Sequence, residues 1–283
     1  MSILQLAIIA LIQGITEWLP ISSSGHVLLA SNYFGFEGRD EYLINAMAHS
    51  GTLLAVLIYF RQDIQRAVLG GFELLYQPFR SRELSPSGYL AGHILASTPI
   101  ALGMILIYEF FVPEDLKIAL RSVETVATTT IVFGVLLWWA DARHSTDRDI
   151  ATMRWRDSIL IGASQAIAAL LPGTSRSGIT MTVARACGYN RSDAAKFSML
   201  IGAPLLAAAG LYAFVQLQSA PVATSIIGLS DGIIIAVLSF LSGLASIHFL
   251  MVLLRRTSFL PFVIYRLILG ILLIISSPTL GLL

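Results

Sequence analysis

Long apolar runs constrain this chain more than any other feature of its sequence. The hydrocarbon core of a bilayer is about 30 Å thick and requires roughly 20 apolar residues per crossing helix. Six runs are long enough: residues 41–60, 88–111, 119–140, 194–217, 229–254 and 259–280. Only 12% of the 283 residues are charged, about half the share found in soluble domains. The sequence therefore predicts an all-α polytopic membrane protein.

The charged residues exclude several classes of partner and site. The 18 Lys and Arg nearly balance the 17 Asp and Glu, which leaves no basic surface for a polyanion. We therefore expect no nucleic-acid partner. The single cysteine, Cys187, excludes an intramolecular disulfide and a cysteine-based metal cluster.

Two further apolar runs are too short to cross a bilayer. Residues 3–18 form a helix of about 24 Å and residues 158–171 one of about 21 Å, at 1.5 Å per residue. Each run ends at a proline, Pro20 or Pro172, and a small polar segment and a second short helix follow. Non-helical backbone at membrane depth is tolerated only where protein or a wet cavity satisfies it. We therefore predict two re-entrant helical hairpins.

A secretory signal peptide is the alternative interpretation of residues 1–24. This segment has no basic residue at its start, and Gln13 and Glu17 interrupt its apolar core. Both features argue against a signal peptide. We therefore expect residues 3–18 to belong to the folded protein.

The two halves of the chain resemble each other. Gln13 precedes Pro20 by seven residues, and Gln165 precedes Pro172 by seven. Each half then holds one hairpin and three spans. An odd number of crossings inserts the second half upside down, which gives the inverted repeat common in transporters. The two broken segments should therefore enter from opposite faces and meet near the midplane.

This arrangement predicts a single integral membrane domain over residues 1–283, with repeat halves at about 1–141 and 155–283. The spans then place thirteen Lys and Arg on one side and three on the other. Cytoplasmic loops carry the excess of positive charge, so the first side is cytoplasmic. We expect both termini on the outer side.

The tip of the first hairpin carries a buried acid. Glu17 alone among the acidic residues lies well inside an apolar run, where a carboxylate costs several kcal/mol unless it is paired or liganded. Gln13 lies one turn earlier on the same helix face, and His26 follows the break at Pro20. The small polar residues between them are Ser22, Ser23, Ser24 and Gly25.

The tip of the second hairpin carries a cation, Arg176. It lies among Thr174, Ser175, Ser177 and Thr180. If the tips meet, the site combines a carboxylate, an imidazole, hydroxyls and a guanidinium with the positive ends of two helices. Arginine binds phosphate oxygens in a bidentate fork, the carboxylate is able to hold a divalent cation or a proton, and a hydroxyl beside a base is a potential nucleophile. This set of groups suits a phosphate.

Three alternatives stay open at this stage. Glu17 and Arg176 would also make a structural ion pair, and the serines would also serve only as caps of the following helices. Arg266, in the last span, is expected to bind backbone carbonyls or to extend toward the cytoplasmic side.

Four segments carry a resemblance to a known family. Residues 13–26, QGITEWLPISSSGH, resemble the (E/Q)xxxE-x-LP-x-SSxGH signature of the undecaprenyl-diphosphate phosphatase family, also known for bacitracin resistance. Residues 172–180, PGTSRSGIT, resemble its PGxSRSGxT signature. Residues 49–55, HSGTLLA, and 258–266, SFLPFVIYR, are also similar to the family pattern.

The resemblance implies a multi-pass enzyme of the bacterial cytoplasmic (inner) membrane. It would hydrolyse undecaprenyl diphosphate, a polyprenyl diphosphate lipid, to undecaprenyl phosphate and inorganic phosphate, and so recycle the lipid carrier for cell-wall synthesis. The resemblance also implies a divalent cation, Mg²⁺ or Ca²⁺, with Glu17 as the metal ligand. We further expect a homodimer.

We assign the site residues accordingly. The expected catalytic residues are Glu17, Ser23, His26 and Arg176. The expected substrate-binding residues are Gln13, Ser22, Ser24, Gly25, Gln165, Thr174, Ser175, Ser177 and Thr180.

The mechanism at this stage is a hypothesis. Ser23 would attack the distal phosphorus, with His26 or Glu17 accepting its proton; attack by water or by His26 is the alternative. The rival function is a transporter or lipid flippase, because broken helices that meet at the midplane are also a transport architecture.

Overall fold

The computed structural model describes residues 3–23, 25–26, 30, 39–76, 83–143, 148–219 and 228–276. Its helices are α1 (Ile3–Trp18), α3 (Arg39–Tyr59), α4 (Arg61–Tyr76), α5 (Pro86–Ala96), α6 (Pro99–Phe111), α7 (Glu114–Leu120), α8 (Val123–Arg143), α9 (Trp155–Leu170), α10 (Arg176–Ala186), α11 (Arg191–Ser219), α12 (Leu229–Leu254) and α13 (Leu260–Ser276), with a short 3-10 turn, η2 (Ile150–Thr152). Within these residues the fold is all-helical, as predicted, apart from one isolated bridge between Arg148 and Tyr189.

Five of the predicted spans are confirmed as long apolar helical segments within the described part of the chain. They correspond to α3, the pair α5–α6, α8, α11 and α12. The sixth, expected at 259–280, appears as α13, which has 17 residues; residues 277–280 lie outside the described ranges. Large apolar side chains such as Phe111, which is 79% exposed, cover the outer surface. An outer surface of this kind requires an apolar solvent, and the chain is a membrane protein.

The span predicted over 88–111 is confirmed as the segment Pro86–Phe111, and it contains a break that the sequence analysis did not predict. α5 ends at Ala96 and α6 begins at Pro99. Proline has no N–H to donate and its ring clashes with the preceding turn, so a helix usually ends before it. The Ser97 hydroxyl donates to the carbonyl oxygens of His93 (2.7 Å) and Ser158 (2.8 Å) at this break. The break thereby joins α5 to α9.

Two other helix assignments also differ from the sequence expectation. The span expected at 119–140 is α8, shifted to begin at Val123, because the separate helix α7 ends at Leu120. The helix α4 was not predicted. It has a high share of charged residues and an exposed apolar face that includes Val68 and Phe72. This composition is below the threshold for a span, which is why the search for apolar runs missed it.

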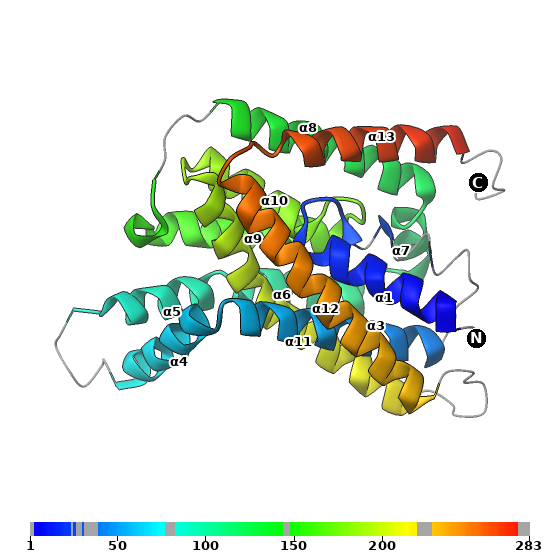
Figure 1. Ribbon diagram of the computed structural model, residues 1–283, viewed down its shortest axis with the longest axis horizontal. Coiled ribbons are helices and arrows are strands. Elements are labelled where there is room, and N and C mark those ends of the chain that lie inside the picture. The colour runs from blue at the N-terminus through cyan, green and yellow to red at the C-terminus, as the bar shows by residue number, and fades with distance from the viewer. Residues whose placement is uncertain are drawn as a thin grey trace.

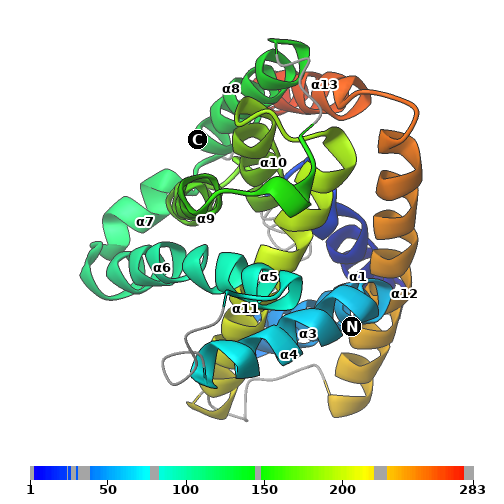
Figure 2. The same cartoon turned by 90° about the vertical axis from the view of Figure 1, so that its left-hand side faces the viewer.

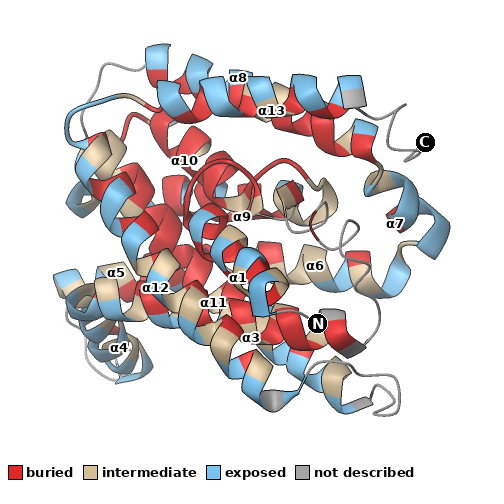
Figure 3. Ribbon diagram, turned by 45° about the vertical axis from the view of Figure 1, so that its right-hand side comes forward, coloured by how far each residue is buried: buried red, intermediate tan, exposed pale blue. Residues whose placement is uncertain are grey.

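The helices pack in two groups around a buried centre. α12 lies along α3 and α1 on one side, and α8 lies along α13 on the other (Figures 1 and 2). Between them, α10 is almost entirely buried, as the red ribbon in Figure 3 shows. Its Met181 belongs to one buried hydrophobic cluster with Trp18 and Phe197, and all three side chains are fully buried. The arrangement places the start of α10 beside the end of α1.

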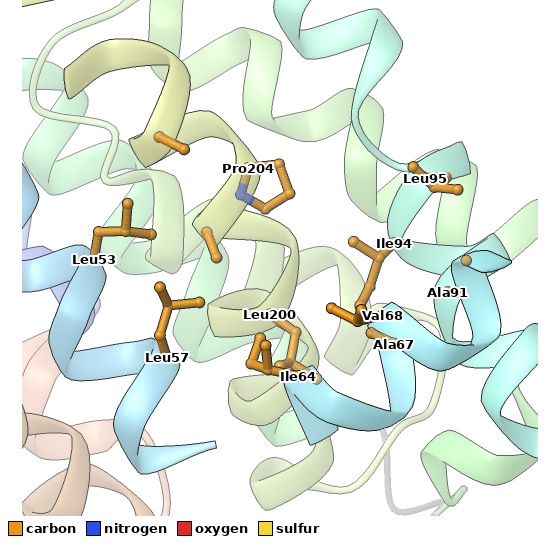
Figure 4. A pocket seen from close by; sticks show the side chains of 13 residues that line it. Leu53, Leu57, Ile64, Ala67, Val68, Ala91, Ile94, Leu95, Leu200 and Pro204 are labelled. Carbon is orange, nitrogen blue, oxygen red and sulfur yellow. The ribbon is translucent and has the colours of Figure 1, made fainter. Parts of the chain in front are cut away.

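An apolar groove of about 350 Å³ lies between α3, α4, α5 and α11 (Figure 4). Leu57, Val68, Ile94, Leu200 and Pro204 are among its lining residues, and every other lining residue is also apolar. A phosphate requires hydrogen-bond donors or positive charge. The polar chemistry of the protein therefore lies elsewhere.

A buried ionic cluster fixes the far end of α10. The Asp141 carboxylate accepts from Arg185 Nε (2.9 Å) and Arg191 Nε (2.8 Å) through one oxygen and from the Phe259 N–H (3.2 Å) through the other. Arg185 is 3% exposed. The Asp141 carboxylate thus joins α8, α10, α11 and the residue before α13.

A second polar pair lies beyond the end of α10. Burial and then the hydrogen bond to Asp157 raise the pKa of Tyr189 well above its usual value. The Tyr189 hydroxyl therefore stays protonated and donates to the Asp157 carboxylate (2.7 Å).

Asp141→Ala is expected to destabilise the fold by about 3–5 kcal/mol, because it removes the carboxylate that pairs with the buried Arg185 cation. Thermal unfolding in detergent measures the effect. Asp115→Ala, at an exposed aspartate in α7, is the matched control and should unfold close to the wild-type temperature. Equal unfolding temperatures for the two variants would contradict this role.

Candidate functional site

The first broken segment follows α1. Pro20 disfavours helical backbone at the residue before it, and α1 ends at Trp18. Ser22 then adopts φ 75°, a left-handed conformation that is rare for residues other than glycine. Its hydroxyl accepts the Gly25 N–H at 3.4 Å. Such a conformation costs of order 1–3 kcal/mol and persists only where the surroundings fix it.

The second broken segment repeats this construction. α9 ends at Leu170, and Ser175 adopts φ 70°. The Ser175 hydroxyl accepts the Gly178 N–H at 3.1 Å and caps α10. Both segments therefore use a left-handed serine that bonds to a glycine three residues later. The two predicted breaks are confirmed, at the predicted places.

The two segments meet, as the sequence predicts. The Ser177 hydroxyl donates to the Leu19 carbonyl oxygen at 2.9 Å. Arg176 Nη2 forms an ion pair with Glu17 Oε1 at 2.8 Å. The structure thus joins a carboxylate and a guanidinium that are 159 residues apart in the chain.

Glu17 is the centre of the polar network. It is buried, with 8% of its surface exposed. Besides Arg176, its carboxylate accepts from Gln13 Nε2 at 3.0 Å and from the Ser23 hydroxyl at 2.8 Å, both at Oε2. A hydroxyl that donates to a carboxylate is oriented to give up its proton to it. This geometry favours Glu17 over His26 as the base for Ser23.

His26 is turned away from Ser23. Its Nδ1 bonds to the Ser22 carbonyl oxygen (2.7 Å) and must donate there, because a carbonyl oxygen only accepts. In the neutral ring Nε2 is then an acceptor, and it lies 2.6 Å from the Tyr265 hydroxyl. The two rings also stack at 5.7 Å between centroids. His26 is therefore linked to α13.

The Arg176 guanidinium is enclosed on three sides. Its Nη1 donates to the Ser198 carbonyl oxygen at 3.3 Å, and its Cζ lies 5.0 Å from the centre of the Trp18 ring. A Cβ atom added at Gly202 would stand 1.8 Å from Nη1. The absence of a side chain at Gly202 makes room for the guanidinium.

The hydroxyls beside Arg176 bond mainly to the protein. Thr180 Oγ1 lies 2.6 Å from Ser198 Oγ, and Ser175 Oγ lies 3.2 Å from Ser177 Oγ. Their expected contact with a phosphate stays a prediction.

Backbone donors at the start of α10 complete the site. Within the described ranges no acceptor is recorded for the backbone N–H groups of Ser175, Arg176 and Ser177. A left-handed residue followed by helical residues points successive N–H groups into one concavity, which binds anions, and the helix dipole adds positive charge there. The start of α10 is therefore built to bind an anion.

The side chains of two predicted site residues, Gln165 and Thr174, make no hydrogen bond to the Glu17–Arg176 pair within the described part of the chain. Gln165 Nε2 bonds to the Ser97 carbonyl oxygen (3.4 Å) at the α5–α6 break. The Thr174 hydroxyl is buried, and neither it nor Gln165 Oε1 has a partner in the described part of the chain. Gly25 bonds to Ser22, as described, and Ser24 lies outside the described residues.

The sequence analysis missed three residues of the site. Ser198 and Gly202 belong to α11, which reads only as an apolar span. Tyr265 falls inside the quoted segment 258–266, and that segment was the signal that would have found it. Arg266 binds backbone carbonyls, the first of its two expected alternatives.

The donor set accommodates a divalent cation only in part. The described residues contain no group of three or more His, Cys, Asp or Glu side chains that would hold a metal alone. Mg²⁺, however, is commonly bound by one or two carboxylates plus substrate phosphates. A carboxylate has about four lone-pair sites, and Glu17 uses three of them for Gln13, Ser23 and Arg176. One position remains for a cation that arrives with a phosphate.

Comparison with known proteins identifies the family of the chain. The chain is 59% identical over 278 residues to an undecaprenyl-diphosphatase of Hyphomonas neptunium, with 98% of each chain covered. It is 44% identical over 275 residues to an undecaprenyl-diphosphatase of Maricaulis maris, covering 97% of this chain and 99% of that protein. A sequence model of the family described as bacitracin resistance protein BacA matches residues 6–272. The chain therefore belongs to the bacitracin resistance protein BacA family.

Proposed function

We propose that this protein hydrolyses undecaprenyl diphosphate to undecaprenyl phosphate and inorganic phosphate in the bacterial cytoplasmic membrane. It thereby recycles the lipid carrier for cell-wall synthesis and confers bacitracin resistance. The observation that carries the proposal is the junction of the two broken segments. There a Ser23–Glu17 pair lies on one side and Arg176 on the other, beside unpaired amides at the start of α10.

The geometry supports a displacement by Ser23. Its oxygen attacks the distal phosphorus while Glu17 takes the hydroxyl proton. The bond from this phosphorus to the bridging oxygen breaks, and undecaprenyl phosphate leaves with the electron pair. Water then hydrolyses the phosphoserine and releases inorganic phosphate. Arg176 and the α10 amides hold the distal phosphate, since phosphoryl transfer depends mainly on positioning and charge stabilisation.

A divalent cation, Mg²⁺ or Ca²⁺, fits this proposal at Glu17, in its one remaining acceptor position. When bound it would neutralise charge on the diphosphate. The proposed roles of Ser23, Glu17 and Arg176 stand on their own contacts and do not depend on which cation is used.

The proposed topology is six transmembrane helices and two re-entrant hairpins in an inverted repeat, with halves near 1–141 and 155–283. Both termini lie outside, and two copies form a homodimer. The support for the repeat is the shared construction of the two breaks, with φ near 70° at Ser22 and at Ser175. Each of these serines accepts the N–H of the glycine three residues later.

Phosphate release from a long-chain polyprenyl diphosphate by purified protein in detergent tests the function. We expect release from the wild type, inhibition by EDTA and loss in Ser23→Ala, whereas Ser230→Ala, at an exposed serine, retains activity. Folded wild type that releases no phosphate across cations and lipids would favour the transporter. Full activity in Ser23→Ala would still support the proposed enzyme activity, but it would show that water and not Ser23 attacks the phosphorus.

Gly202→Ala is expected to lower phosphate release by about 100-fold, because a misplacement of about 1 Å at a positioned group has an effect of this size. The added methyl carbon would stand 1.8 Å from Arg176 Nη1 and 2.5 Å from its Cζ, so the flexible guanidinium must move. Displacing the guanidinium also weakens its buried ion pair with Glu17, so the unfolding temperature should fall as well, and activity is compared per amount of folded protein. Gly210→Ala in the same helix meets nothing closer than 3.9 Å and serves as the control. Equal activities in the two variants would contradict this account.

A further inference from the structure

Arg266 is a buried cation at the junction of the two broken segments. It comes from α13 and is 0% exposed. All its recorded hydrogen bonds go to backbone carbonyl oxygens, and no carboxylate pairs with it in the described part of the chain. Burying a cation inside a membrane protein costs free energy, so a buried arginine is expected to have a structural or functional role.

The carbonyls that Arg266 binds belong to both segments. Nη1 donates to Pro20 (3.2 Å) in the first, and Nη2 donates to Gly173 and Thr174 (3.0 Å each) in the second. Nε donates to Thr130 in α8 (3.0 Å). One planar side chain therefore ties the two segments to each other and to a long helix.

This attachment also orients the anion-binding amides. In a trans peptide the C=O and the next N–H point in opposite directions, and the chain contains no cis peptide among its described residues. Because the Thr174 carbonyl points at Arg266, the N–H of Ser175 points away from it, to the side where Arg266 makes no bond. Ser175 is also the left-handed residue with φ 70°. Arg266 thus holds the residue whose conformation forms the concavity.

We propose that Arg266 is a positioning residue that keeps the two broken segments in register and turns the amides at the start of α10 toward the distal phosphate. This inference rests on the proposed function. It assigns Arg266 no contact with the substrate: its effect passes through the carbonyls that it binds.

The fork geometry makes lysine a poor substitute. Arginine offers five N–H donors in a fixed plane, whereas an ammonium is a compact point charge with three. The surroundings fit the plane closely: a Cβ atom at Gly134 would stand 3.2 Å from Arg266 Cβ, and one at Gly178 would stand 2.8 Å from its Nη1. Arg266→Lys therefore keeps the positive charge but loses the set of hydrogen bonds that joins the two broken segments and α8.

The test compares Arg266→Lys with Arg256→Lys, the same change at an exposed arginine. Thermal unfolding, kcat, KM and the inhibition constant for inorganic phosphate are measured for each. We expect Arg266→Lys to stay folded, to lose about 100-fold in kcat, and to bind inorganic phosphate at least several-fold more weakly; Arg256→Lys should match the wild type. A merely structural role lowers the unfolding temperature and the amount of active protein but leaves KM and the phosphate inhibition constant unchanged, and that result would overturn the proposal.

Two further measurements keep the outcomes distinct. If Arg266→Lys does not fold, Gly178→Ala keeps the arginine but crowds both its Nη1 (2.8 Å) and the Ser175 side chain that it positions (3.0 Å), and unchanged kcat and phosphate affinity in that variant would refute the positioning role. If the wild type releases no phosphate, the proposed function fails; equilibrium binding of inorganic phosphate to wild type and Arg266→Lys then decides the inference alone. Equal phosphate affinities of the wild type and Arg266→Lys would contradict the positioning role.

Discussion

Glu17→Gln is expected to lower kcat by about 10³-fold, within the range attributed to a general base. The amide still accepts one hydrogen bond but takes no proton from Ser23, whose hydroxyl lies 2.8 Å from Glu17 Oε2. KM should change little, because the substitution removes both a negative charge that repels the diphosphate and the ligand proposed for the cation, and these two effects oppose each other. Steady-state phosphate release measures both constants.

The same variant separates catalysis from a structural ion pair. If Glu17 and Arg176 only stabilise the fold, Glu17→Gln leaves a buried cation unpaired and lowers the unfolding temperature, while the remaining folded protein keeps its kcat. Glu114→Gln removes an exposed carboxylate that pairs with Lys117 at 3.3 Å and controls for the loss of one negative charge. A kcat equal to that of this control would exclude Glu17 as the base.

Arg176→Lys is expected to lower kcat/KM by about 10³-fold, the lower end of the effect of an arginine that stabilises a transferring phosphate. The guanidinium holds Glu17 with Nη2 and the Ser198 carbonyl oxygen with Nη1 at the same time, over the Trp18 ring. An ammonium is a point charge and does not reproduce the fork. The loss should appear in both kcat and KM, because the phosphate is bound before and during the reaction.

Arg143→Lys is a matched control for that substitution. Arg143 is exposed, and its Cζ lies 5.1 Å from the centre of the Trp139 ring, so the chemical change and the aromatic neighbour are alike. Its activity should equal that of the wild type. Retained activity in Arg176→Lys, with Arg143→Lys also unchanged, would remove Arg176 from phosphate binding.

The breaks in the apolar pattern were strong local signals. Proline disfavours helical backbone at the residue before it, and the first short helix ends where the sequence predicts, at Trp18, just before Pro20. The rule has exceptions, since Pro204 lies inside α11. Glu17 stands out because a charge in an apolar run is rare, and Arg176 stands out because it is the one charged residue of the segment 172–180. The resemblance, carried by contiguous motifs, identified the family before any contact was known.

Local sequence patterns did not predict which residues of distant helices contact the site. Nothing in the sequence of α11 shows that Gly202 makes room for Arg176, or that Ser198 accepts from it, because an apolar span has the same pattern whatever it packs against. The pairing of His26 with Tyr265 rather than with Ser23 likewise depends on where α13 lies. The choice of Glu17 as base for Ser23 follows from that placement.

The sequence by itself determined the composition of the protein: an apolar, all-helical chain, two helix breaks, an acid inside the apolar run before the first break and an arginine in the polar segment of the second. Local rules of proline, charge and helix length act within a few residues, so they need no knowledge of the fold. Only the tertiary structure decided which of these groups meet. Hydrogen-bond partners 239 residues apart, such as His26 and Tyr265, are selected by the packing of whole helices, and that packing is not encoded in any single segment.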